Sequence, residues 1–267
     1  MKRSGAIFFF ITVVFLVHPF YACAGKDITF PVLQNYLLSQ DEFKSLSEDL
    51  GLSLNYNLLG PASNLGWTGF EIGGSLSFAV IDKNASYWRK AIQDHNPPSY
   101  LLIPRLIIRK GLPWGIDVGV SYLHIPNSNI SLVGAEAQYA ILKDGIVQPA
   151  ISLRGAYSSL LGVKELSMQV IDVSVAISKK MLIFEPYAGI AGVFIMSKPD
   201  TIPSSSTVLP TPPALPTPSS LVYLKEADVS ELQGTVGVQL DLTIARFAVE
   251  AAFSKIPVYS VKLTFGL

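Results

Sequence analysis

Polar and apolar residues alternate one for one through residues 231–267. Between Leu232 and Leu242 the even positions carry an aliphatic residue or Gly, and the odd positions carry a polar residue or Gly. A period of two is that of a β-strand with one apolar and one polar face. The segments 246–253 and 259–267 repeat the pattern, so three consecutive strands are predicted in this region.

The same alternation recurs upstream in seven segments. We predict strands over 70–80, 100–109, 116–123, 130–142, 146–157, 167–178 and 182–195. Tight turns at 111–115, 143–145 and 179–180 join them into hairpins. Counted from Trp67, the chain therefore contains about ten strands, with about 8 to 12 possible. The range stays open because 52–59 could be a further strand, paired near 28–33, or a segment that lines the interior.

Composition and the N-terminus place these strands in a particular class of protein. Of the 267 residues, 49% are hydrophobic and only 15% are charged, against about 25% charged in a usual soluble domain. Residues 1–24 read as a secretory signal peptide, because Lys2 and Arg3 precede an apolar core and a small-x-small site at 22–24. Cleavage there removes Cys23, the single cysteine, although cleavage before Cys23 with lipidation is an alternative.

The charged residues of the strands fall on one common face, opposite the large apolar side chains. That face otherwise carries Gly, Ala and Ser, which suits an enclosed polar lumen better than the solvated face of a sandwich. Closing the sheet would also satisfy its backbone groups in lipid. We therefore predict an all-β fold, a closed antiparallel transmembrane β-barrel. Its candidate lumen-lining residues are Glu71, Arg105, Arg109, Asp117, Glu136, Arg154, Asp172, Glu185, Asp241, Glu250 and Lys262.

Two stretches follow a helical period. Ser39 and Glu42 form a capping box, and Phe43 shares a face with Leu46 and Leu50 ahead of Gly51, the expected C-terminal cap. This short amphipathic helix must cover the periplasmic mouth of the barrel or its interior, so 25–66 is predicted to be a plug-like segment. Residues 84–94 form a second helix in a structured loop.

The C-terminal run Tyr259-x-Val261-x-Leu263-x-Phe265-x-Leu267 resembles the terminal strand of Gram-negative outer-membrane β-barrels, although that pattern usually ends in Phe. The segments 68–73 and 110–119 also resemble parts of uncharacterised proteobacterial outer-membrane proteins. The resemblance implies recognition by the barrel assembly machinery, outer-membrane lipid as the surroundings, and tight turns at 111, 144, 179 and 244 on the periplasmic side. The barrel would span 67–267, with the proline-rich stretch 198–220 as an extracellular loop.

Candidate chemistry is sparse. His95 follows Asp94, an acid and histidine pair, but two polar residues at a helix end are the simpler explanation, and we favour it. His124 lies an odd number of residues from Ser121, so the two face opposite sides of a strand. We predict no enzyme, no metal site and no cofactor, and the near-neutral charge gives no basis for nucleic-acid binding.

About ten strands leave a constricted lumen, because eight leave room only for side chains and sixteen or more leave a channel. We expect a narrow or gated outer-membrane channel or transporter for small or apolar solutes. The alternative is a structural or surface-binding barrel that acts through its extracellular loops. The lumenal charges would select solutes in the first case and only pair with one another in the second.

Overall fold

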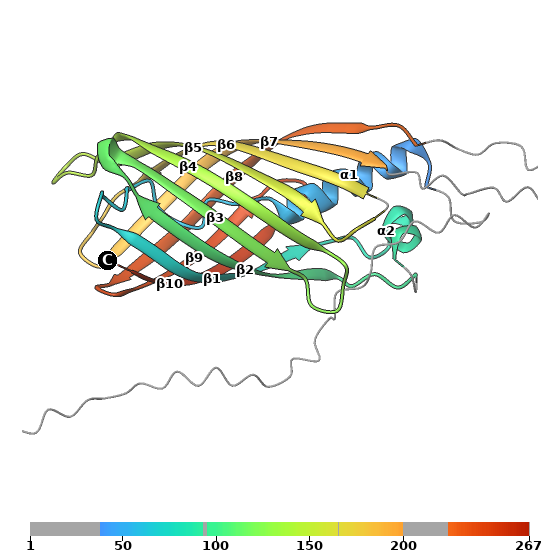
Figure 1. The fold of residues 1–267 in the computed structure, drawn as a ribbon, viewed down its shortest axis with the longest axis horizontal. Helices are drawn as coiled ribbons and strands as arrows, with labels where there is room; N and C mark the ends of the chain where they lie inside the picture. The colour runs from blue at the N-terminus through green and yellow to red at the C-terminus, as the bar shows by residue number, and fades with distance from the viewer. Residues whose placement is uncertain (1–37, 93–94, 165, 200–223, 267) are drawn as a thin grey trace, which may run out of the picture.

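A computed structural model describes residues 38–92, 95–164, 166–199 and 224–266. Ten strands pair in antiparallel order into one closed barrel, in which β1 completes the ring by pairing with β10 (Figure 1). The predicted fold class and strand number are confirmed. The strands are β1 Phe70–Val80, β2 Tyr100–Gly111, β3 Ile116–His124, β4 Ser131–Leu142, β5 Ala150–Leu161, β6 Leu166–Ser178, β7 Phe184–Pro199, β8 Ala227–Leu242, β9 Ala245–Phe253 and β10 Val258–Gly266.

Alternation along each strand separates a buried inner face from an exposed outer face. The outer face of every strand carries exposed large apolar side chains. One example from each of β1 to β10 is Ile72, Ile108, Val120, Tyr139, Leu153, Val175, Ile190, Val236, Val249 and Val261. Because a solvated sheet face is normally polar, this apolar belt requires an apolar environment around the barrel.

The two ends of the barrel differ in their connections. At one end, here called the turn end, lie the connections 112–115, 143–149, 179–183 and 243–244. The opposite end, here called the loop end, carries 81–99 with the short helix α2 (Ser86–Ala91), together with 125–130 and 254–257. β10 ends at the turn end (Figure 1).

Helix α1 (Gln40–Leu54) begins with the predicted capping box, in which Ser39 and Glu42 each accept from the other's backbone N–H. It enters the barrel at the loop end (Figure 1). The expected end at Gly51 is wrong, because the helix continues to Leu54. Gly51 instead lies against Ile195 of β7. A Cβ atom added at Gly51 would lie only 2.6 Å from the Ile195 side chain. It therefore serves close packing rather than a left-handed cap.

Residues 55–69, here called the lumenal segment, then run through the barrel to the turn end, where β1 begins. They include no strand, so 52–59 is the end of α1 followed by interior chain. No helix among the described residues is long and apolar enough to cross a bilayer.

Three predicted boundaries are corrected. β5 begins at Ala150 rather than Ile146, because the Gly145 N–H closes a turn onto the Gln148 carbonyl and Pro149 has no N–H for a ladder. β7 extends through Lys198 and Pro199, which were expected to be loop. The second helix covers only Ser86–Ala91. The signal peptide and residues 200–220 of the proline-rich stretch lie outside the described residues.

Candidate functional site

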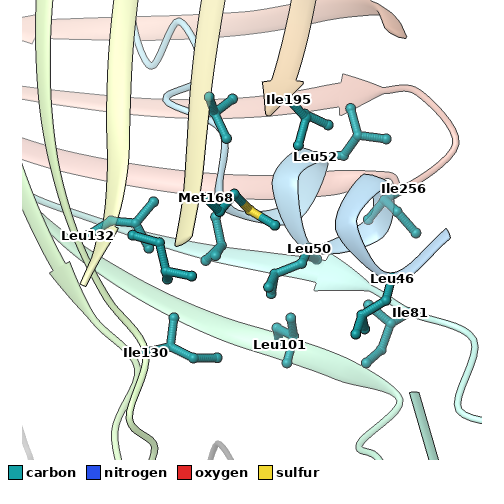
Figure 2. Packing of buried hydrophobic residues seen from close by; sticks show 14 of the residues in the cluster. Leu46, Leu50, Leu52, Ile81, Leu101, Ile130, Leu132, Met168, Ile195 and Ile256 are labelled. Carbon is teal, nitrogen blue, oxygen red and sulfur yellow. The ribbon is translucent and has the colours of Figure 1, made fainter. Parts of the chain in front are cut away.

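The lumen has two halves with opposite chemistry. The half near the loop end is apolar and encloses α1, whose Phe43, Leu46, Leu50, Leu52 and Leu54 are fully buried. Figure 2 shows the labelled wall residues around the helix; they are Ile81, Leu101, Ile130, Leu132, Met168, Ile195 and Ile256. Each buried side chain of this size contributes about 1.5–3 kcal/mol, so helix docking is worth on the order of 10 kcal/mol.

The half near the turn end is polar and holds a continuous network of ion pairs. Lys262 of β10 contacts Glu71 of β1 at 2.9 Å, across the seam where the barrel closes. Glu71 contacts Arg109 of β2 at 3.4 Å, and the Arg109 Nε lies 2.9 Å from Glu136 of β4. All of these side chains are buried, so each charge depends on its partners for compensation.

Arg154 of β5 extends the network. Its guanidinium lies 2.6 Å from Glu136 and 3.3 Å from Asp172 of β6. Asp117 of β3 joins from the other side, 3.7 Å from Arg109. The network therefore ties together the inner faces of β10 and of β1 to β6.

Charged side chains of the wall also bind the backbone of the chain inside the barrel, from the end of α1 onwards. Arg105 donates to the carbonyls of Leu54 and Asn55 at 2.9 and 2.8 Å. Arg154 donates to those of Tyr56 and Asn57 at 2.8 and 3.1 Å. An extended chain has no internal hydrogen bonds, and buried carbonyls need partners. The wall of the barrel supplies these partners.

Carboxylates perform the complementary task for backbone N–H groups. Glu250 accepts from Leu59 at 2.7 Å, and Asp117 accepts from Leu65 at 3.0 Å. The hydroxyl of Ser178 accepts from Ala62 at 3.1 Å, and Gln138 donates to the Ala62 carbonyl at 3.2 Å. The lumenal segment is thus bonded to the wall along most of its length.

Side chains of the segment also contact the network. The Tyr56 ring lies between Arg105 and Arg154, whose guanidinium carbons are 4.7 and 4.8 Å from the ring centroid. Asn55 donates to Asp172 at 2.9 Å and to Gln233 at 3.0 Å. These contacts place the centre of the polar half at residues 55–57.

Ten of the predicted lumen-lining residues are buried on the inner face. Glu185 accepts from Ser178 at 2.8 Å, and Glu250 accepts from Tyr187 at 3.0 Å. Asp241 is the exception, because it lies partly exposed at the turn end, where Lys180 contacts it at 2.5 Å. The neutral partners Gln138, Gln233 and Ser178 share the polar face of their strands; a search for charges alone omits them.

A second polar cluster joins α2 to residues 42–49 of α1. Asp49 accepts from Tyr87 at 2.8 Å and from Trp88 at 3.1 Å. Glu42 binds Lys90 at 2.7 Å and Ser86 at 2.7 Å. Burial alone would raise the pKa of Glu42, but the hydrogen bonds from Lys90, Ser39 and Ser86 outweigh it and lower that pKa to about 2.

The two histidines in the described part of the chain, His95 and His124, lie on the surface. The ring of His124 is exposed, on the face opposite to Ser121, and is hydrogen-bonded to Ser131. His95 is exposed and hydrogen-bonded to the Arg89 carbonyl, and Asp94 lies outside the described residues. Among the residues that the structure describes, no group of three or more potential metal ligands of the His, Cys, Asp or Glu type is close enough to hold an ion.

No protein-family model and no curated protein sequence matches the chain. Among solved structures, it is similar to the outer membrane protein OprG of Pseudomonas aeruginosa, at 9% identity and a TM-score of 0.32, over 78% of this chain and 98% of that one. It is also similar to Ail, the attachment invasion locus protein of Yersinia pestis, at 11% identity and a TM-score of 0.22, over 74% and 95%. A Rh. blastica porin mutant matches at 6% identity and a TM-score of 0.21, over 74% and 99%.

The strand pairing of this chain, rather than its similarity to other structures, establishes the architecture. It is a closed ten-stranded β-barrel. Its lumen holds a helix in one half and an extended segment in the other.

Proposed function

We propose that the protein is an outer-membrane β-barrel that is closed to the free passage of solutes and acts at its loop end, as a structural or surface-binding barrel. The apolar belt on all ten strands supports the membrane location, because lipid is the environment that such a surface needs. The predicted signal peptide and the C-terminal strand pattern support the outer membrane in particular.

The plug that fills the lumen is the observation on which this function rests. Between Phe43 and Ala62, the side chains that face the wall are buried. Wall residues bind the backbone of the lumenal segment at six positions or more. The buried apolar contacts of the helix, worth on the order of 10 kcal/mol before the entropy of ordering the chain is subtracted, oppose its release.

The narrow or gated channel expected from the sequence remains a prediction that requires the plug to leave. Its strongest support is the number of charged residues in the lumen. Those charges, however, are bonded to one another and to the plug backbone. This arrangement favours the second of the two functions over the first.

Planar-bilayer conductance of the purified full-length protein tests the proposal. We expect no conductance steps from the wild type, and steps from a variant that lacks residues 40–66. If that deletion does not fold, the full-length double variant Leu50→Ala with Arg154→Leu, which loosens the plug in both halves of the lumen, is the substitute. Regular steps from the wild type that change in size with Arg154→Leu would overturn the proposal and establish a channel.

A further inference from the structure

The contacts of residues 40–69 define the direction in which the chain passes through the barrel. At the loop end the Gln40 side chain binds the backbone of Lys225 twice, at 3.1 and 2.8 Å, immediately before β8. Leu54 and Asn57 then bind Arg105 and Arg154 in the middle of β2 and β5. The chain therefore travels from the loop end inward.

The path ends at the opposite mouth. Leu65 binds Asp117 near the start of β3, and the Gly69 carbonyl accepts from Gly111 at the end of β2. Extended chain advances about 3.3 Å per residue, so residues 55–69 are long enough to cross an apolar band of about 25 Å. β1 then starts at the turn end, beside the end of β10.

The apolar belt indicates which end projects from the bilayer. On the outer face of β8, apolar positions run from Leu232 to Leu242, next to the turn 243–244. With a rise of about 3.3 Å per residue and a tilt of about 40°, this stretch covers about 25 Å, the height of the lipid-facing band. Asp228 and Ser230, also exposed, lie beyond it at the loop end. On β8 the apolar stretch therefore begins at the turn end, and the strand continues past it at the loop end.

Taken with the outer-membrane location, these observations point to an unusual topology. We propose that the chain enters its own barrel from the cell surface, so that residues 38–44 lie on the extracellular face and the lumenal segment runs from there towards the periplasm. This inference rests on the proposed function, because it takes the loop end to be extracellular and the turn end to be periplasmic.

The topology has two consequences. Gln40 lies beside Lys225, so the start of α1 and the residues just before β8 form one composite surface outside the cell. In addition, a chain delivered to the periplasm must place residues 38–44 on the outer side before β1 pairs with β10. The seam pair Lys262–Glu71 then closes the barrel around the segment.

Cysteine labelling on intact cells tests this topology. Each site is introduced singly into full-length protein that carries Cys23→Ala, and a membrane-impermeant maleimide is added before and after permeabilisation of the outer membrane. Asp41→Cys and Lys44→Cys report the start of α1, where both residues are exposed. Lys83→Cys reports the loop end and Ile146→Cys the turn end, also at exposed positions.

We expect Asp41→Cys, Lys44→Cys and Lys83→Cys to react on intact cells, and Ile146→Cys to react only after permeabilisation. Reaction of Lys83→Cys on intact cells, with Asp41→Cys and Lys44→Cys protected until permeabilisation, would overturn the inference while the membrane orientation stands. Reaction of Ile146→Cys on intact cells, with the other three sites protected, would show an inverted barrel and so overturn the proposed orientation. Labelling in detergent micelles confirms that every cysteine is reactive.

Discussion

The two halves of the lumen enclose the same chain in two conformations, and their walls differ accordingly. Near the loop end the chain is helical, its backbone is bonded internally, and the wall around it is built from residues such as Leu101, Leu132 and Ile195. Near the turn end the chain is extended, and Arg105, Arg154 and Glu250 bind its backbone. The chemistry of each wall thus follows the hydrogen-bonding state of the chain it encloses.

This comparison changes the meaning of the charges inside the barrel. Buried charges on a barrel's inner face suggest a path for ions or solutes. Here two arginines, Arg105 and Arg154, and two carboxylates, Glu250 and Asp117, complete backbone hydrogen bonds of a segment that is largely extended. They belong to the core of the protein in the same sense as the leucines of the other half.

The largest effect is expected in the polar half, from Arg154→Met. The substitution removes the cation that pairs with Glu136 and Asp172. It also removes the donor that binds the carbonyls of Tyr56 and Asn57. Removing one partner from a buried ion network typically costs about 3–5 kcal/mol. Urea unfolding of the protein in micelles measures it, with Arg246→Met, a partly exposed arginine near Asp241, as the matched control. An equal loss in both variants would show that the buried network has no special role.

A double substitution separates the two tasks of Arg154. If this arginine served only Glu136, Arg154→Met combined with Glu136→Leu would restore stability, since hydrophobic replacement of a whole pair is often neutral. We expect a residual loss of about 1–3 kcal/mol for each carbonyl left unbonded, in addition to the cost of removing one partner from Asp172 and one from Arg109. Full recovery in the same unfolding assay would mean that the charges pair only with one another.

In the apolar half, Leu50→Ala should destabilise the barrel by about 2–5 kcal/mol, because it leaves a cavity between α1 and the wall. The exposed Ile244→Ala at the turn end is the control, with an expected change near zero. Conductance measured on the same protein sharpens the comparison. The Leu50→Ala variant should remain silent in a planar bilayer, because the polar half still holds the segment in place.

Gly51→Val tests the close approach of α1 to β7. An added side chain meets Ile195 within 2.7 Å, and overpacking of this kind typically costs about 1–3 kcal/mol. Gly145→Val, in an exposed turn where an added Cβ would meet an atom at 3.6 Å, is the control. Equal unfolding midpoints for the two variants would contradict the packing.

The smallest effect concerns the cluster that fastens α2. The pKa of Glu42 is lowered in the folded state to about 2, so its contribution to stability is complete above its ordinary pKa near 4.5. This contribution is lost as the pH falls from there to about 2. Hydrogen-exchange protection of the α2 backbone, measured relative to the intrinsic exchange rate at each pH, should therefore fall over this window, whereas protection in β4 and β5 should not. Glu42→Gln should remove this pH dependence; an unchanged profile in that variant would show that Glu42 is not its source.

The sequence alone determined the barrel and which face of each strand points inward. Period-two alternation assigns each residue to a face, and the small residues and isolated charges of one face indicate that it is enclosed. The capping box of Ser39 and Glu42 likewise located the start of α1, because capping is a local interaction. Boundaries at Ile146, Lys198 and Gly51 were wrong, since ladder bonds and helix packing, rather than local pattern, decide where an element ends.

Only the tertiary structure decided what fills the lumen. Nothing in residues 55–69 shows that Arg105 and Arg154 donate to their carbonyls, because these partners are about 50 to 100 residues away in the chain. The chemistry of each side chain can be read directly from the sequence. The partners that hydrogen-bond to an extended backbone, however, can come from any part of the fold. For that reason the charges could be assigned to the interior in advance, while their role in holding the plug became visible only in the closed barrel.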